Sequence, residues 1–231
     1  MIQLAQRQHC LIFGLEVDII RDESHDLLQE RLWEDIRQLI QEADALFMAP
    51  PCNTFSRARN HYVDGGGPRP IRVQDYPYGF PWLSQSDRQV AEAANVLVFR
   101  SFELAKLAIM HKVSFALEHP EQLGLVKGLV PGSIWDFEEF HEILETSSST
   151  TFAFHQCQFQ ATSSKPTRIL QRGVQWSDAV LHDGLPQLDA SGCYLGPLPR
   201  ACGHQRPPLL GKDEQTGKWL SLIHISEPTR L

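Results

Sequence analysis

The sequence contains no hydrophobic run long enough to cross a membrane, and it lacks a secretory signal. A membrane span needs about 18 or more consecutive apolar residues, and a signal peptide needs a basic segment before its apolar core. The 231 residues contain neither pattern. We therefore expect no membrane partner and an intracellular location, in the cytoplasm or the nucleus.

Cysteine is scarce and irregularly spaced, so the sequence predicts no disulfide framework. The five cysteines stand at positions 10, 52, 157, 193 and 202. An odd number without a signal peptide indicates reduced thiols in an intracellular protein. Cys193, Cys202 and His204 could contribute to a metal site, but strong zinc sites contain paired Cys-x-x-Cys motifs, which are missing here. We therefore predict no metal.

Positive charge is also scarce overall. The formal net charge of −7 argues against a generally basic surface for nucleic acid. The basic residues are concentrated in three stretches, 57–72, 165–172 and 200–212. Because local charge determines where a phosphate chain can lie, these stretches are compatible with an enzyme that acts on nucleic acid.

What the chain does contain is an alternation of buried strands and helices, and this predicts an α/β fold. Strands are expected at 10–20, 45–49, 113–117, 152–159 and 167–170, and helices at 27–43, 86–111 and 136–145. Such sheets bind ligands at the carboxyl ends of parallel strands. Residues 60–82, rich in glycine, proline and aromatic residues, predict a long loop with a functional role.

The strand at 45–49 leads directly to a candidate nucleophile. It stops at Pro50 and Pro51, because neither can donate to a sheet ladder, and Cys52 follows at once. A thiolate at this edge of the sheet could attack an electron-poor carbon. A thiol with a pKa of about 8.5 needs nearby positive charge to ionise, and we expect Arg57 and Arg59 to supply part of it. The alternative is a small buried cysteine without a chemical role.

A second strand has the same arrangement, with an acid in place of the thiol. The segment FALEHPE, 115–121, places Glu118 directly after an apolar run and before Pro120. Glu118 would emerge at the same edge as Cys52, one strand away, where a carboxyl group could hydrogen-bond a ring nitrogen of a substrate. The alternatives are a helix-capping glutamate and a surface acid.

Together these residues resemble the cytosine-C5 DNA methyltransferase family. Pro50-Pro51-Cys52, followed by Phe55-Ser56, is similar to the family's Pro-Cys motif, and Leu117-Glu118-His119-Pro120 resembles its Glu-Asn motif with histidine replacing asparagine. HQCQFQATSSKPTRIL, 155–170, resembles a later segment of phage-like or mobile-element-associated members. The three motifs occur in the family's order, and the resemblance spans about residues 15–170.

The resemblance implies a Rossmann-like, S-adenosylmethionine-dependent methyltransferase sheet and methyl transfer to cytosine C5 in DNA through a covalent cysteine adduct. It gives Cys52 the attack on C6 and Glu118 the contact with N3 and the exocyclic amine. Either Arg168 or Lys165 would support the base after it is flipped out of the duplex. The DNA contacts would come from Ser56, Arg57 and Arg59.

The methyl donor implied by the resemblance is S-adenosylmethionine. Family members bind it with a strand followed by a Phe-x-Gly-x-Gly turn, and this sequence has only Gly14 in that region. The candidate cofactor-binding residues that remain are acids after the first strand, the following Asp-Leu pair and the first proline of the Pro-Cys motif: Glu16, Asp18, Asp26, Leu27 and Pro50. We expect the missing strand and turn to lie upstream of Met1, so that the sheet is incomplete and the chain as given binds the cofactor weakly.

We expect a monomer with three regions. These are a methyltransferase-like core at 1–170, a loop-rich region at 171–219 and a tail at 220–231. The tail sequence LSLIHISEPTR resembles the translation of a transposase-based sequencing adapter, so we expect it to be non-native.

Two other functions fit parts of the pattern. A non-catalytic, nucleic-acid-binding remnant of a mobile-element or phage protein would keep the basic loop without cofactor binding. An amino-methyltransferase would also have two prolines at a strand end, preceded by Asp, Asn or Ser and followed by an aromatic residue. Ala49 and Cys52 occupy those two positions here, which disfavours that class.

Overall fold

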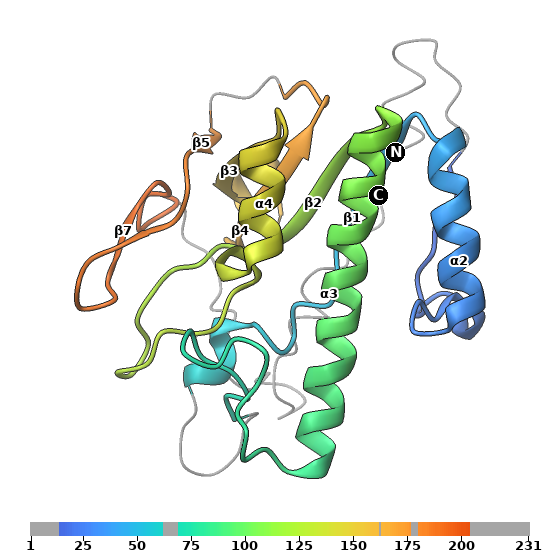
Figure 1. The fold of residues 1–231 in the computed structure, drawn as a ribbon. Helices are drawn as coiled ribbons and strands as arrows, with labels where there is room; N and C mark the ends of the chain where they lie inside the picture. The colour runs from blue at the N-terminus through green and yellow to red at the C-terminus, as the bar shows by residue number, and fades with distance from the viewer. Residues whose placement is uncertain (1–13, 62–68, 162, 177–179, 204–231) are drawn as a thin grey trace. The chain divides into compact units, whose positions relative to one another are not determined.

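The computed structural model describes residues 14–61, 69–161, 163–176 and 180–203 (Figure 1). The chain divides into two compact units, Met1–Ile36 and Arg37–Leu231, and each is described by itself. His204 and the tail at 220–231 lie outside the described residues. Within the described part, no helix has the length and apolar character that a membrane crossing requires.

In the first unit, the strand predicted at 10–20 is wrong over its described part, 14–20, which forms no strand. Asp18 organises a turn instead, because its carboxylate accepts a hydrogen bond from the Ile20 amide (2.9 Å) and its carbonyl accepts one from the Arg21 amide (3.0 Å). Such local bonds compete with a sheet ladder for the same backbone groups. A 3-10 turn, η1 (Glu23–His25), follows.

The helix predicted at 27–43 forms later than expected. The α-helix α2 covers Glu30–Leu39, across the boundary between the two units, and continues as a 3-10 turn, η2 (Ile40–Glu42). Residues 26–29 form turns in which Asp26 accepts bonds from the Leu28 and Gln29 amides. Asp26 therefore delays the start of the helix.

The second unit is built on a five-stranded mixed sheet in the order β1-β2-β4-β3-β5. β1 and β2 are parallel, whereas β4 is antiparallel to both of its neighbours and β5 is antiparallel to β3. The strands are β1 (Ala45–Met48), β2 (Ser114–Pro120), β3 (Thr150–His155), β4 (Pro166–Arg172) and β5 (His182–Asp183). Together with the helices, this sheet confirms the predicted α/β class.

Two helices accompany the sheet in Figure 1. The α-helix α3 (Gln85–His111) begins at Ser84, whose hydroxyl accepts a bond from the Asp87 amide, and it packs against β2. It ends at Lys112, which has a left-handed backbone with φ of 61°. The shorter α4 (Glu138–Thr146) follows the 3-10 turn η4 (Ile134–Asp136) and packs against α3.

Alternation along the strands separates two faces of the sheet. Ala116 of β2 packs with Phe152 and Ile169 in one apolar cluster, and Ala153 packs with Tyr194 and Leu198 in another. Since successive residues of a strand point to opposite faces, Glu118 lies on the face of Ala116 and His119 lies on the other. The register pairs Glu118 with Ile169 and His119 with Arg168.

The region after residue 170 is continuous with the sheet. The predicted boundary between 170 and 171 falls inside β4, and β5 pairs with β3. A hairpin of β6 (Gln187–Leu188) and β7 (Tyr194–Gly196) follows, and its Tyr194 hydroxyl donates a hydrogen bond to Glu121, just beyond β2. Residues 171–203 therefore complete the second unit where they are described.

Candidate functional site

Cys52 and Glu118 stand at the same edge of the sheet, as the sequence predicts. Met48, the last residue of β1, pairs in parallel with Leu117 of β2. Glu118 follows Leu117, so it lies one residue beyond the end of β1 on the neighbouring strand. The chain leaves β1 through the buried Pro50, and Cys52 opens a turn in which its carbonyl accepts the Phe55 amide (3.0 Å). The thiol is only partly exposed.

The turn that carries Cys52 is anchored by Phe55. The Phe55 ring meets the His119 ring edge-on with 5.1 Å between centroids, and the Arg72 guanidinium carbon lies 3.8 Å from the Phe55 centroid. Arg72 is 2% exposed and donates to the Pro77 carbonyl and the Asn95 side chain, each at 2.7 Å. Burial and the charge of Arg59 lower its pKa to about 10. Arg72 therefore belongs to the interior of the protein, although it lies in the basic stretch 57–72 that the sequence makes compatible with nucleic acid.

A network of donors surrounds one oxygen of the Glu118 carboxylate. The Lys165 ammonium lies 3.2 Å from Glu118 Oε1, with side-chain exposures of 13% and 14%. The Thr167 hydroxyl and the Gln156 amide also donate to this oxygen, at 3.4 and 3.5 Å, and Gln156 donates to Thr167 at 3.0 Å. All three of these contacts go to the same oxygen, Oε1.

Gln156 and Thr167 are site residues that sequence reasoning missed. Both lie in the 155–170 segment that carries the third motif, so that segment was their only signal. Lys165 and Thr167 are two residues apart at the start of β4, a spacing that puts both on one face. That they surround Glu118 depends on the pairing of β4 with β2, which the motif does not specify.

The charges of Lys165 and Glu118 both act on the pKa of the Cys52 thiol. Burial is the largest effect and raises the Cys52 pKa, whereas the charge of Lys165 lowers it and that of Glu118 raises it. The thiol therefore shares one local electrostatic environment with both side chains. The charge of Lys165 offsets only part of the effect of burial, so the pKa of the Cys52 thiol stays above that of an ordinary thiol.

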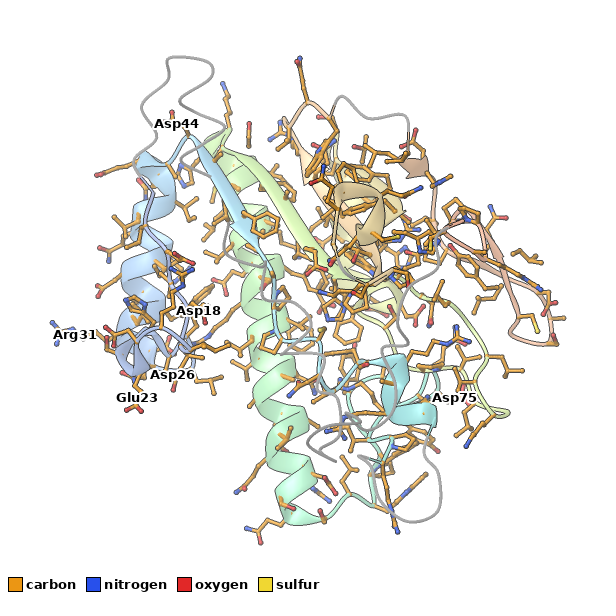
Figure 2. All side chains as sticks on the ribbon, turned by 180° about the vertical axis from the view of Figure 1, so that it is seen from behind. Asp18, Glu23, Asp26, Arg31, Asp44 and Asp75 are labelled. Carbon is orange, nitrogen blue, oxygen red and sulfur yellow. The ribbon has the colours of Figure 1, made fainter. Side chains whose placement is uncertain are left out.

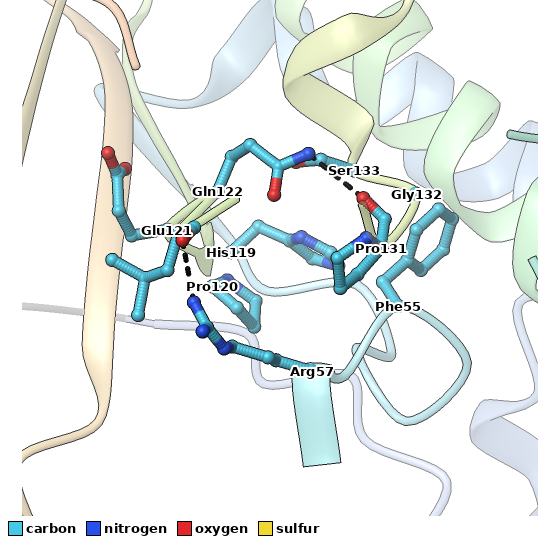
Figure 3. Close-up of a pocket in the computed structure, with 10 residues that line it drawn as sticks. Phe55, Arg57, His119, Pro120, Glu121, Gln122, Pro131, Gly132 and Ser133 are labelled. Atoms are coloured by element: carbon cyan, nitrogen blue, oxygen red, sulfur yellow. Dashed lines mark hydrogen bonds between the residues drawn. The ribbon is translucent and has the colours of Figure 1, made fainter. Parts of the chain in front are cut away.

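Arg57 and Arg59, expected to supply that charge, bind backbone carbonyls instead. Arg57 donates to the Leu123 and Leu125 carbonyls at 2.6 and 3.1 Å, the first shown in Figure 3. Arg59 donates to the Asn53 and Arg69 carbonyls at 2.9 and 2.8 Å. These bonds hold the segment after Cys52 in place.

Ser56 is buried, and its hydroxyl accepts the Ala58 amide (3.1 Å) at the start of the 3-10 turn η3 (Arg57–His61). The observed hydrogen bonds of the three residues assigned to DNA by resemblance are therefore internal to the protein.

Arg168 does not reach Glu118, so the structure favours Lys165 of the two predicted basic residues. Its side chain is fully buried and forms an ion pair with Glu121, with nitrogen–oxygen distances of 2.6 and 2.9 Å. The guanidinium also donates to the Thr151 hydroxyl (3.0 Å) and the Gly184 carbonyl (2.6 Å). Because Arg168 follows Thr167 in β4, it points to the opposite face of the sheet.

His119, which replaces the asparagine of the family motif, is a buried neutral imidazole. It is 1% exposed, and its pKa is lowered to about 3, chiefly by burial and further by the charges of Lys165 and Arg72. The Pro51 backbone opposes this shift, but neither ring nitrogen has a partner within ordinary hydrogen-bond geometry in the described chain. The ring lines a cavity of about 30 Å³ (Figure 3), which has room for one water molecule.

The acids assigned to the cofactor belong to the first unit and are engaged locally. Glu16 forms an ion pair with Arg21 (2.9 Å), Asp18 caps its own turn, and Asp26 accepts the Leu28 amide (2.9 Å); Figure 2 labels Asp18 and Asp26. Leu27 is partly buried beside them. Within the described residues of this unit, neither a strand nor a glycine-rich turn precedes these acids. The described residues therefore do not fit a cradle for S-adenosylmethionine.

The structure assembles no metal-ligand group among the described residues. No cluster of three or more His, Cys, Asp or Glu side chains is present there, and no disulfide joins the described cysteines. Cys193 lies in the β6–β7 hairpin, where its amide donates to Asp189. His204, the other residue considered for a metal, lies outside the described residues.

Comparison with family models, with curated proteins and with solved structures gave no match for this chain. The functional assignment therefore depends on the arrangement of Cys52, Glu118 and Lys165.

Proposed function

We propose that this chain activates cytosine in DNA for methylation at C5, in the manner of DNA (cytosine-5) methyltransferases. The observation that carries the proposal is the Lys165–Glu118 pair beside the Cys52 thiol, where the chain leaves β1 next to the parallel strand β2. A thiol in the turn after β1 and a carboxyl group on β2 could contact C6 and N3 of one pyrimidine ring.

The chemistry follows from these groups. The Cys52 thiolate adds to C6, which forms the sulfur–carbon bond and moves the C5–C6 π electrons toward N3. Glu118, a carboxylate beside Lys165, takes up the proton that the Cys52 thiol gives up and delivers it to N3, so the adduct is a neutral enamine with electron density on C5. Lys165 forms the ion pair with the Glu118 carboxylate, and its charge favours the Cys52 thiolate. After C5 has reacted, loss of the C5 proton to solvent, return of the N3 proton to Glu118 and expulsion of the Cys52 thiolate restore the aromatic ring.

By resemblance, S-adenosylmethionine would supply the methyl group to C5 as an electrophile. The described residues form no site for it, so the steps above concern only the activation of the base. The mixed sheet, with β1 and β2 parallel, is compatible with a Rossmann-like methyltransferase sheet, and this compatibility supports the proposal. We propose DNA as the macromolecular partner, because a target base must reach a partly buried thiol by leaving its stack.

Exchange of the C5 hydrogen tests the activation step without a methyl donor. Once C6 carries the thiol, C5 can take a proton from water and lose the original one, so DNA with tritium at cytosine C5 releases label into solvent. We expect release with the unaltered chain and none with Cys52→Ser, because a hydroxyl is a far poorer nucleophile without a dedicated base. Cys193→Ser, which alters a thiol of the β6–β7 hairpin, is the matched control and should release label normally. Equal release from Cys52→Ser would contradict the proposal.

A second candidate is nucleic-acid binding without chemistry. It is favoured by the raised pKa of Cys52, since burial disfavours the thiolate, and by the local engagement of the first unit's acids. Measuring DNA binding and tritium release on the same protein separates the enzyme from the binding protein. DNA binding without release of label, in the unaltered chain across neutral to alkaline pH, would support the binding protein over the enzyme.

A further inference from the structure

Three aromatic side chains form an exposed cluster in the second unit, which we call the aromatic platform: Tyr76, Phe80 and Trp82. The Phe80 and Trp82 rings are stacked, with centroids 5.0 Å apart and planes 16° from parallel. Tyr76 meets the Trp82 ring edge-on at 5.3 Å. Trp82 is 68% exposed and Tyr76 is 42% exposed, although aromatic rings of this size are ordinarily largely buried.

The platform is held by a rigid backbone. The Phe80 amide donates to the carbonyl of Ile71 (3.0 Å), and the Tyr76 amide donates to the carbonyl of Val73 (3.0 Å), where both acceptor residues are buried. Gly79, between the rings, has φ of 120°, and a Cβ there would lie 3.2 Å from the Leu83 side chain. Position 79 therefore requires glycine, and the backbone that carries Tyr76 and Phe80 is anchored to buried residues.

Exposed arginines accompany the segment that carries the platform, in a chain that is acidic overall. Arg88 donates to the Pro81 carbonyl at 3.1 Å, directly beside Trp82, and Arg59 donates to the Arg69 carbonyl at 2.8 Å. In the described residues 57–61 and 69–88, Arg69 and Arg88 are exposed and Arg57 and Arg59 are partly exposed, whereas Arg72 is buried; the acids there are Asp75 and Asp87. Figure 2 labels Asp75, which precedes Tyr76. This local excess of positive charge contrasts with the net charge of −7 for the chain.

Rigid exposed rings beside arginines are the combination that binds unpaired nucleic-acid strands, because bases stack on the rings while phosphates meet the cations. An apolar protein partner or a second copy of the chain would cover the rings without a need for the arginines. The charge complementarity therefore favours a polyanion that carries aromatic groups.

We propose that the aromatic platform binds the unpaired bases of a single-stranded or locally opened DNA strand. This inference deepens the proposed function and rests on it for the choice of DNA as ligand. Arg59 joins the platform's segment to the Cys52 turn, since it donates both to the Arg69 carbonyl and to the Asn53 carbonyl. A duplex from which a base has been flipped exposes unstacked bases, and the platform would hold that opened strand.

Fluorescence anisotropy with a labelled oligothymidylate tests the proposal. We expect Trp82→Ala to weaken binding about 10-fold or more at fixed low salt, in line with the loss of one base-stacking contact. Trp82→Phe, which keeps an aromatic face, should restore most of the affinity. Trp176→Ala is the matched control, because Trp176 is 40% exposed but packs on Phe152, away from the platform's rings. It should bind like the unaltered chain.

The outcomes separate this inference from the proposed function. Oligothymidylate binding that depends on Trp82, without tritium release from DNA, would support the platform and overturn the enzyme. Tritium release by the unaltered chain, together with unchanged oligothymidylate binding by Trp82→Ala, would support the enzyme and overturn the platform. If no oligonucleotide binds and Trp82→Ala instead abolishes self-association in sedimentation, the surface is an interface between copies and the inference is wrong.

Discussion

The Lys165 ammonium and the Glu118 carboxylate lie 3.2 Å apart, and both side chains are almost buried. An exposed pair of this kind would contribute little, because water screens it. Here burial strengthens the attraction between the two charges. Both charges also shift the pKa of the Cys52 thiol, in opposite directions. Lys165 therefore contacts the carboxylate that would protonate the base in the proposed function, and its charge also acts on the thiol that would attack the base.

The first prediction concerns Glu118. Glu118→Gln should slow tritium release from cytosine C5 by about 10²-fold or more, because the proton for N3 can no longer be delivered. The substitution keeps the size of the side chain and its place beside Lys165, Gln156 and Thr167, so DNA affinity should change little. The ratio of release rates at saturating DNA is the measurement. A rate within twofold of the unaltered chain would remove Glu118 from the chemistry.

The second prediction concerns the reactivity of Cys52. Since burial raises its pKa, alkylation by iodoacetamide should accelerate only at a pH above that of an ordinary thiol. Lys165→Met should move the profile to higher pH, because the charge that lowers the pKa is lost, and Glu118→Gln should move it to lower pH. Mass spectrometry of the Cys52 peptide gives the rate at each pH. Shifts of the two variants in the same direction would contradict the electrostatic assignment.

The third prediction separates Arg168 from the site. Arg168→Met should destabilise the chain by about 3–5 kcal/mol, because it leaves the Glu121 carboxylate buried without its charged partner. Tyr194→Phe removes one hydrogen bond to Glu121 and should cost about 1–3 kcal/mol. Urea unfolding measures both free energies. Full stability of Arg168→Met, with lost DNA binding, would restore the predicted role of Arg168 at the base.

The fourth prediction is a pH dependence of stability from His119. Its pKa is about 3 in the folded chain and about 6.5 when unfolded, so between these values the unfolded chain binds the extra proton. The stabilising contribution is complete above pH 6.5 and is lost as the pH falls toward 3, at about 1.4 kcal/mol for each pH unit. His119→Asn should flatten this part of the profile. Equal slopes in urea unfolding for both chains would show that His119 titrates normally.

The sequence predicts the edge of the sheet well because the signals there are local. Two prolines end β1, an apolar run defines β2, and parallel pairing brings their ends together. Cys52 and Glu118 could therefore be found without knowledge of distant contacts. The strand expected at 14–20 fails for the opposite reason, since the carboxylate of Asp18 captures a neighbouring amide in a turn that an apolar pattern does not reveal.

The basic residues were harder to assign, because their roles depend on partners far away in the chain. Lys165 and Arg168 stand three residues apart, and the choice between them depends on the face to which each points. The partners of Arg168 are Glu121 and the Gly184 carbonyl, which sequence spacing does not bring together. The burial of Arg72 within the basic stretch 57–72 is not predictable for the same reason, since its contact with Phe55 is tertiary.

The buried Arg168–Glu121 ion pair also determines how much of the chain must be synthesised before the second unit can pack fully. Arg168 follows Glu121 by 47 residues, and Tyr194, which completes the coordination of the carboxylate, follows it by 73. A nascent chain that has emerged only as far as Arg168 holds both charges without the hydroxyl that closes over them. The second unit can therefore reach its final packing only after the β6–β7 hairpin has left the ribosome.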